Sequence, residues 1–319
     1  MSTFNTIKNI GEKSILSSLE DNIKSFLDWG FLNIGGFINC SIPSSGNNPI
    51  TVLKPVSYPP KPANTVWESS RKDWVYETNI AYTGMQPINI SGIYINSQFN
   101  ALPLTDDDIV GLSISNTPYS INYPLGQIVF VSGIPSNTSV KLNYSYRYVQ
   151  VYKSNENIWW KELQKIAYSP QRTSTPDGDK KLFSDHRIQL PCIIIEIIPR
   201  MYQTPYELGN IKNIITQDVL LHIFTDNPSQ RANLADILIA QKDKDSFLYN
   251  INKLLKNNKQ PLLNNGNKNP NGLNYHQIVS NHQYLSNAYY IENSILSEYN
   301  QISSSLYNAV VRWTLKIYP

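Results

Sequence analysis

The pattern of apolar and polar positions is most informative between residues 190 and 238, where it predicts a strand, a polar loop, a second strand and a helix. Residues 190–198 and 218–225 are apolar runs of strand length, rich in Ile, Leu and Val. The helix is expected to begin at Asp226 or Asn227, because either side chain can cap it and Pro228 suits the first helical position. We therefore expect a rigid α+β unit here, with the helix packed on a sheet.

Further patterns are expected to complete this C-terminal unit. Residues 286–299 and 306–318 predict two late strands. In the second of them apolar and mostly polar positions alternate, so that one face is buried and the other half-exposed. Residues 246–255 fit either a strand or a helix. Residues 257–274, rich in Asn, Gly and Pro, predict a loop, and residues 155–167 predict a helix.

A single apolar stripe predicts an N-terminal helix over residues 6–29, and the glycines that follow, Gly30, Gly35 and Gly36, are expected to end it and to let a bend pack closely. This helix either docks on its own chain or forms an arm that packs on a neighbouring subunit. Residues 41–65 carry a series of prolines, which forbid a helix. They predict an extended linker between domains or a strap across another subunit.

Residues 66–153 predict an all-β unit of sandwich or barrel type, because short strand patterns recur between turn residues. The expected strands are residues 74–77, 88–96, 119–123, 127–131 and 139–152. The predicted fold class is therefore α+β. Its expected segments are an N-terminal helical segment (1–40), a Pro-rich linker (41–65), a β-sandwich-like domain (66–153) and an α+β domain (154–319).

Composition adds one observation to this picture: the chain has few charged residues. Charged residues make up 16% of the 319 residues, against roughly a quarter in typical soluble domains. A net charge of +3 without a basic stripe predicts neither nucleic-acid nor membrane binding, and no apolar run has the length of a transmembrane helix. Two explanations stay open: an AT-rich genome, or a surface largely covered by neighbouring subunits.

No residue pattern predicts catalysis, a cofactor or a metal site. The nucleophile elbow, the phosphate loop and the dinucleotide fingerprint are absent. Metal-ligand spacing is missing among the histidines, which are His186, His222, His276 and His282. Cys192 is expected to be a buried, inert thiol, and with Cys40 it indicates no disulfide framework. The acidic runs 106–108 and 177–179 are expected to be loops. We therefore predict no catalytic, cofactor-binding or metal-ligating residues and a chain that is not an enzyme. The alternative that would make it one is a carboxylate pair assembled from distant positions.

Four tyrosines recur at a period of two along the expected strand 139–152: Tyr144, Tyr146, Tyr148 and Tyr152. On an exposed face they would form a stacking platform for sugars or bases. In a sandwich they are cross-strand packing, which we favour. The platform is the basis of an alternative function, a receptor- or glycan-binding module that loses binding when Tyr146 or Tyr148 becomes Ala.

The C-terminal part, from residue 190 to residue 318, resembles the tail terminator (tail-completion) proteins of tailed phages. The shared features are the apolar strand 193–198, the strand 219–225 that leads at once into the helix from Asn227, and the closing strand 306–318. The order of elements, with the sequence Phe-Leu-Asp-Trp-Gly at residues 26–30, is similar to neck-region structural proteins of contractile-tailed phages. The inserted β domain departs from a minimal terminator, so that a collar or baseplate position is the alternative.

The resemblance implies a virion structural protein of the tail or neck, assembled in the host cytoplasm, with no cofactor and no membrane partner. It implies a homohexameric ring that contacts the tail tube and sheath proteins, terminates the tube and joins it to the head-tail connector protein. Candidate contact elements are the loops 199–216 and 257–274 and the N-terminal segment. Candidates for a lumen through which DNA passes are Arg200, Lys212, Lys253 and Lys256.

Overall fold

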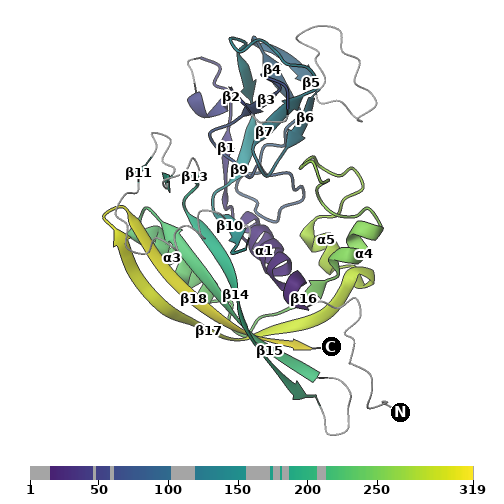
Figure 1. The fold of residues 1–319 in the computed structure, drawn as a ribbon, viewed down its shortest axis with the longest axis vertical. Helices are drawn as coiled ribbons and strands as arrows, with labels where there is room; N and C mark the ends of the chain where they lie inside the picture. Colours follow the sequence, from purple (N-terminus) through teal and green to yellow (C-terminus); the bar gives the residue numbers. More distant parts are fainter. Residues whose placement is uncertain are drawn as a thin grey trace.

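A computed structural model describes residues 15–45, 48–57, 61–101, 119–155, 173–174, 180–181, 187–206 and 213–318. The fold is mixed α+β and consists mostly of strands in curled sheets, with a helix near the N-terminus (Figure 1). The predicted fold class is confirmed at this level. Two larger sheets organise the chain, one of seven strands and one of six.

The N-terminal helix α1 (Ile15–Asn33) docks on its own chain in the described residues. Its apolar stripe, which includes Leu19, Ile23 and Leu27, is buried in one cluster with the six-stranded sheet. The predicted end at residue 29 is short by about one turn, since α1 runs to Asn33, and of the three glycines expected to stop the helix Gly30 lies inside it. A Cβ at Gly30 would meet nothing within 4 Å, so packing does not require glycine there. A glycine inside a helix costs about 0.5–1 kcal/mol relative to alanine, which the helix tolerates.

The helix ends instead in a Schellman motif. Gly35 has φ +84°, a conformation that glycine adopts without strain. The N–H of Gly36 donates to the Phe31 carbonyl at 2.8 Å, and the N–H of Gly35 donates to the Leu32 carbonyl at 3.1 Å. Burial of Phe31 and Leu32 explains the extra turn, because ending the helix at Gly30 would remove both side chains from their packed positions.

The middle sheet has the strand order β5-β4-β8-β2-β3-β7-β6. Its strands are β2 (Val52–Val56), β3 (Val66–Glu68), β4 (Gly92–Ile95), β5 (Gln98–Ala101), β6 (Tyr119–Asn122), β7 (Gln127–Phe130) and β8 (Val140–Leu142). The hairpin predicted at 119–131 is confirmed as β6 and β7. The strand predicted at 88–96 shortens to β4. That predicted at 74–77 reduces to a single bridge between Trp74 and Tyr146.

The expected Pro-rich linker contributes a strand to this sheet, which corrects the idea of a spacer at 41–65. After a 3-10 turn, η1 (Pro49–Thr51), strand β2 pairs with β8 through its first two residues and with β3 through Lys54–Val56. The two ladders involve different halves of β2. Pro55 therefore lies where the strand is paired on one side only, a position that proline tolerates.

The strand predicted at 139–152 is three strands in three different pairings. β8 belongs to the middle sheet, β9 (Tyr144–Arg147) pairs with β1 (Phe37–Cys40), and β10 (Gln150–Lys153) lies parallel to β14 (Cys192–Pro205). The chain thus passes from the middle sheet to the C-terminal sheet within this run. The expected boundary after residue 153 is corrected, because β10 already belongs to the six-stranded sheet.

The six-stranded sheet has the order β10-β14-β15-β18-β17-β16. The elements after β14 are β15 (Asn213–Thr225), α3 (Pro228–Ile239), β16 (Asp245–Tyr249), α4 (Ile251–Lys256), α5 (Tyr275–Val279), η3 (His282–Tyr284), β17 (Leu285–Ser303) and β18 (Leu306–Tyr318). Three very short strands, β11 (Thr173–Ser174), β12 (Lys180–Lys181) and β13 (Arg187–Ile188), pair with one another. Helices α1 and α3 share one buried cluster with the sheet and cover the same face of it.

Several predictions for the C-terminal unit are confirmed. Asn227 is the N-cap of α3 and accepts a hydrogen bond from the Ser229 N–H at 2.8 Å. The alternation in β18 is present, with Trp313 and Leu315 buried and Arg312 half-buried. The ambiguous stretch 246–255 contains both of the predicted states, strand β16 followed by helix α4. The helix predicted at 155–167 lies outside the described residues.

Candidate functional site

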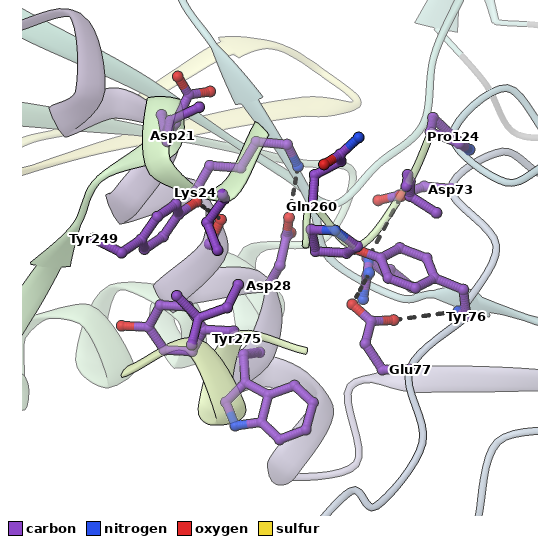
Figure 2. Close-up of a pocket in the computed structure, with 18 residues that line it drawn as sticks. Asp21, Lys24, Asp28, Asp73, Tyr76, Glu77, Pro124, Tyr249, Gln260 and Tyr275 are labelled. Atoms are coloured by element: carbon purple, nitrogen blue, oxygen red, sulfur yellow. Dashed lines mark hydrogen bonds and ion pairs between the residues drawn. The ribbon is translucent and has the colours of Figure 1, made fainter. Parts of the chain in front are cut away.

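A cavity of about 360 Å³ lies where α1, the loop around residue 75 and the segment 249–278 meet (Figure 2). Its walls carry several charged groups on an otherwise aromatic and aliphatic lining. The charged lining residues are Asp21, Lys24, Asp28, Asp73, Glu77 and Arg147. They come from α1, from the loop before residue 78 and from β9, so the cavity marks the junction between the two sheet systems.

Arg147 is the centre of this charge cluster. Its Nη2 bonds to Glu77 Oε1, and its Nε lies 3.3 Å from Asp73 Oδ1. The side chains of Arg147 and Glu77 are only 4% and 6% exposed, so this ion pair is buried. The guanidinium carbon also lies 5.5 Å from the centre of the Tyr76 ring. On α1, Lys24 Nζ forms a separate ion pair with Asp28 Oδ2 at 2.6 Å.

The cluster keeps its charges because opposite charges face one another. Burial would lower the pKa of Arg147, but Glu77 and Asp73 outweigh it and hold that pKa well above its ordinary value. Burial likewise opposes the charge on Lys24, and Asp28 and Asp73 overcome it, so the pKa of Lys24 is raised. The arrangement acts as an ionic tie between the loop that carries Asp73 and Glu77 and strand β9.

The cavity shows no assembled catalytic or metal-binding set. Over the ranges that the structure describes, His, Cys, Asp and Glu side chains do not gather in threes at metal-ligand distances. The guanidinium of Arg147, the central cation of the cluster, already binds two carboxylates. The sequence offered one signal for this cluster: Glu77 and Arg147 are charges embedded in aromatic strand-like runs, which indicates burial with a partner.

The residues singled out from the sequence do not gather in one place. His222 lies on β15 and bonds Glu196 Oε2 at 2.7 Å, while His276 and His282 are exposed at α5 and η3. Cys192 is fully buried, as predicted, and Cys40 is buried too, with its pKa raised to about 11 by burial. His186 and the acidic runs 106–108 and 177–179 lie outside the described residues.

The tyrosine platform is not formed, because the expected strand is divided. Tyr144 and Tyr146 are buried in the middle sheet's cluster. Tyr148 packs against the cluster of the six-stranded sheet, and Tyr152 against a third cluster at the end of β14. The four rings therefore share no exposed face, and this geometry removes the basis for a glycan-stacking strand.

The proposed basic lining residues also lie apart. Arg200 is exposed on β14, near the β14–β15 turn, whereas Lys253 and Lys256 are exposed on α4, which is distant from that turn in Figure 1. Lys212 falls outside the described residues. These cations do not form a basic stripe in the part of the chain that can be described.

One of the two expected loops is a pair of strands, and the other is a loop as predicted. Most of 199–216 belongs to β14 and β15, which extend as a long hairpin beyond the covered part of the sheet. The sequence indicates a loop at these residues because their apolar members, such as Met201 with Tyr202 and Ile214 with Ile215, stand side by side and give no alternation of apolar and polar positions. The loop 257–274 is confirmed as irregular. It packs on its own chain, since the Gly266 carbonyl accepts the Tyr123 N–H at 3.1 Å and Asn274 Nδ2 donates to the Thr78 carbonyl at 3.0 Å.

Both outer strands of the six-stranded sheet leave long edges without a described strand partner. β10 covers β14 only as far as Ile195, and the ladder of β16 with β17 ends at Tyr290. Beyond these points lie the β14 edge (residues 196–205) and the β17 edge (residues 293–303). Large apolar side chains are exposed on and beside these edges: Met201, Tyr202, Tyr206, Ile295, Leu296, Tyr299 and Ile302. The edges are the strongest candidate for a functional surface.

No helix in the described residues is long and apolar enough to cross a membrane. No family model matches the chain, and neither curated proteins nor solved structures match it.

Proposed function

We propose that this chain is a virion structural protein of the phage neck or tail. In this proposal it forms a homo-oligomeric ring, hexameric by the resemblance, that terminates the tail tube and joins it to the head connector. The six-stranded sheet with α1 and α3 is then the tail-terminator-like domain. The seven-stranded sheet is a sandwich-like attachment to it.

The observation that carries the proposal is the pair of open, apolar sheet edges. Monomeric proteins protect sheet edges with charges, short strands or covering elements, because an open edge pairs with other chains. Here the β17 edge has exposed side chains on both faces from Ile295 to Ile302. A chain of this construction is stable in solution only when copies of itself or other proteins cover these edges, as in a closed ring.

Termination follows from the same property. A tube ring exposes strand edges and loops that template the next ring. A protein that covers this surface and presents a different surface on its other side stops the addition of rings. The tail tube and sheath proteins on one side and the connector protein on the other are the proposed partners.

The polar face of the sheet suits a channel that DNA must pass without being held. The charges on it pair across strands, with Glu196 beside His222, Asp218 beside Arg312 and Glu292 beside Lys316. Tight DNA binding needs a surplus of unpaired cations that release counterions from phosphate. Mutual pairing removes that surplus, so any lumenal contact with DNA is transient in this proposal.

Two measurements test the function. Light scattering coupled to size-exclusion chromatography, with negative-stain images, should show a closed ring from the purified protein. An antibody against the chain should label purified particles at the junction of head and tail. Label at the far end of the tail would move the proposal to the baseplate. A monomer at every concentration, together with absence from purified particles, would refute it.

A further inference from the structure

We infer that the β17 edge of one copy pairs with the β14 edge of the next copy, so that the six-stranded sheets join edge to edge around the ring. The inference deepens the proposed function and rests on it. The occupant of each edge is therefore a second copy of this chain. The contact joins two different surfaces and is head-to-tail.

The two edges offer free backbone on opposite sides of the same sheet. Across the described residues, the β14 edge is paired with β15 on one side only, and the β17 edge with β18 on one side only. Pro199 and Pro205, which lack a backbone donor, bracket the stretch from Arg200 to Thr204. We therefore expect the new ladder at Arg200–Thr204.

The charges of the two edges are complementary. In the β14 edge Glu196 is already paired with His222, and Arg200 is the only other charged residue. Glu298 is the only charged residue of the β17 edge. Arg200 and Glu298 are both exposed. Two copies of the β17 edge would bring Glu298 against itself, and two copies of the β14 edge would do the same with Arg200. Charge thus favours the unlike pairing.

The two charges also lie on the same face of the sheet, as an edge-to-edge contact requires. Glu298 pairs with Val310 of β18. Arg200 stacks over the ring of Tyr202, 4.9 Å from its centre, and Tyr202 pairs with Thr216, which in turn pairs with Lys316. Val310 and Lys316 are an even number of residues apart on β18. Their side chains, and those of Glu298 and Arg200, therefore point to one side.

The β17 edge is held in place before any partner arrives. Arg231 of α3 lies 3.5 Å from the centre of the Tyr299 ring and 5.3 Å from that of Tyr307, so the two tyrosines enclose it. Its Nη1 donates to the Asn300 carbonyl at 2.5 Å. Arg231 is buried, and it fixes the β17–β18 hairpin to the helix. A preorganised strand loses less conformational entropy on pairing.

The positions of the two edges imply a stagger between copies. Within one copy Glu298 lies in the same row as Ile194, through Val310 and His222. Joining Glu298 to Arg200 of the next copy shifts that copy along the strands. Counted on β15, because β14 has an irregularity between Ile197 and Met201, the row moves from His222 to the neighbourhood of Gln217, the partner of Met201, which is roughly 15 Å at about 3.3 Å per residue. Strands that tilt against the axis of a barrel have such an offset. Figure 1 shows the two hairpins extending in different directions from the sheet, as this stagger needs.

Cross-linking between two single-cysteine variants tests the contact. Native Cys40 and Cys192 are buried, so a short bismaleimide should react at the introduced thiols. Arg200→Cys mixed with Glu298→Cys should give a covalent dimer, and each variant alone should not. Phe99→Cys, exposed on the distant strand β5, is the matched control and should not link to Glu298→Cys.

Charge reversal provides the second measurement. Arg200→Glu or Glu298→Arg alone should weaken self-association roughly tenfold or more, because like charges meet. The double variant Arg200→Glu with Glu298→Arg should restore it. Circular dichroism verifies the fold of each variant, and both sites are exposed.

The outcomes separate this contact from the function. Rings that form without the mixed cross-link and without any effect of charge reversal would overturn the edge contact and leave the neck function standing. Cross-linking of Glu298→Cys alone would also overturn it, in favour of a symmetric dimer. A monomer at every concentration, absent from particles, would remove both proposals.

Discussion

Replacing Arg147 by Met should destabilise the protein by about 3–5 kcal/mol, the usual result of removing one partner of a buried ion pair. Methionine keeps most of the aliphatic packing, so the loss measures charge and hydrogen bonding. Most of this loss of stability comes from Glu77, whose side chain is 6% exposed and would be left as a buried carboxylate without a cation. Asp73 contributes less because its side chain is 20% exposed and is reached by water.

Urea denaturation followed by circular dichroism measures this change as a difference in the free energy of unfolding. The matched control is Lys72→Ala. Lys72 lies 3.7 Å from Glu68 with both side chains partly exposed, and its loss should change stability by less than about 1 kcal/mol. A double variant, Arg147→Met with Glu77→Leu, should recover most of the lost stability, because the most deeply buried carboxylate is removed together with its partner and Asp73, which stays, is reached by water. A cost for Arg147→Met as small as that of the control would refute the idea of a buried ionic tie.

Three further changes have expected outcomes that thermal or urea unfolding can check. Gly30→Ala should stabilise the protein by about 0.5–1 kcal/mol, because the added methyl meets nothing within 4 Å and helix entropy improves; a loss would contradict this. Gly126→Ala should destabilise it by more than about 1 kcal/mol, because Gly126 has φ +63° and a Cβ there would lie 2.4 Å from the Arg71 carbonyl oxygen; an unchanged midpoint would contradict the tight turn. The hydrogen bond with His222 lowers the pKa of Glu196 below its ordinary value of 4.5, so its contribution is present above that pH and is lost as the pH falls through the lower folded-state value. Glu196→Gln should therefore reduce the acid sensitivity of the melting temperature below about pH 4.5, and an identical pH profile would argue against the pair.

Elements with a complete local signal could be predicted from the sequence. The start of α3 is an example, because Asn227 and Pro228 are both preferred at their positions and the cap hydrogen bond depends on neighbours in the chain. The alternation of β18 is another, since one face packs on α3 through Trp313, whose Nε1 donates to the Leu238 carbonyl at 3.1 Å. The contacts that determine these elements are either local, as at the cap of α3, or repeat at the period of the element, as along β18.

Strand partners could not be predicted in the same way. The run 139–152 has a continuous strand pattern, yet it serves three pairings, and nothing in a period-two pattern marks where the partner changes. The outer halves of β14 and β15 were missed for a different reason. In β14 the side chains beyond Ile198 are exposed on both faces, and in β15 residues 213–216 are all half-buried, so that neither segment shows the alternation that marks a strand.

The ionic cluster was beyond sequence reasoning because its members are brought together by the fold. Lys24, the neighbours Asp73 and Glu77, and Arg147 come from three separate parts of the chain, and each resembles a surface charge. One indication of their burial is present in the sequence. Two of them, Glu77 and Arg147, stand among aromatic residues, where an unpaired charge would be costly. Such charges predict a buried partner without identifying it.

The shortage of charge can now be weighed against the location of exposed apolar groups. A bias of the genome towards Ile and Tyr codons acts on all positions alike, and selection on a monomer would still place charges on open sheet edges. The β17 edge instead carries Ile295, Leu296, Tyr299 and Ile302, with Glu298 as its single charge. The β14 edge carries Met201 and Tyr202 beside a single arginine. A composition effect alone gives no reason for the two opposite edges of one sheet to gather exposed apolar groups beside exposed charges of opposite sign, Arg200 and Glu298. The proposed association between copies through these edges accounts for that distribution.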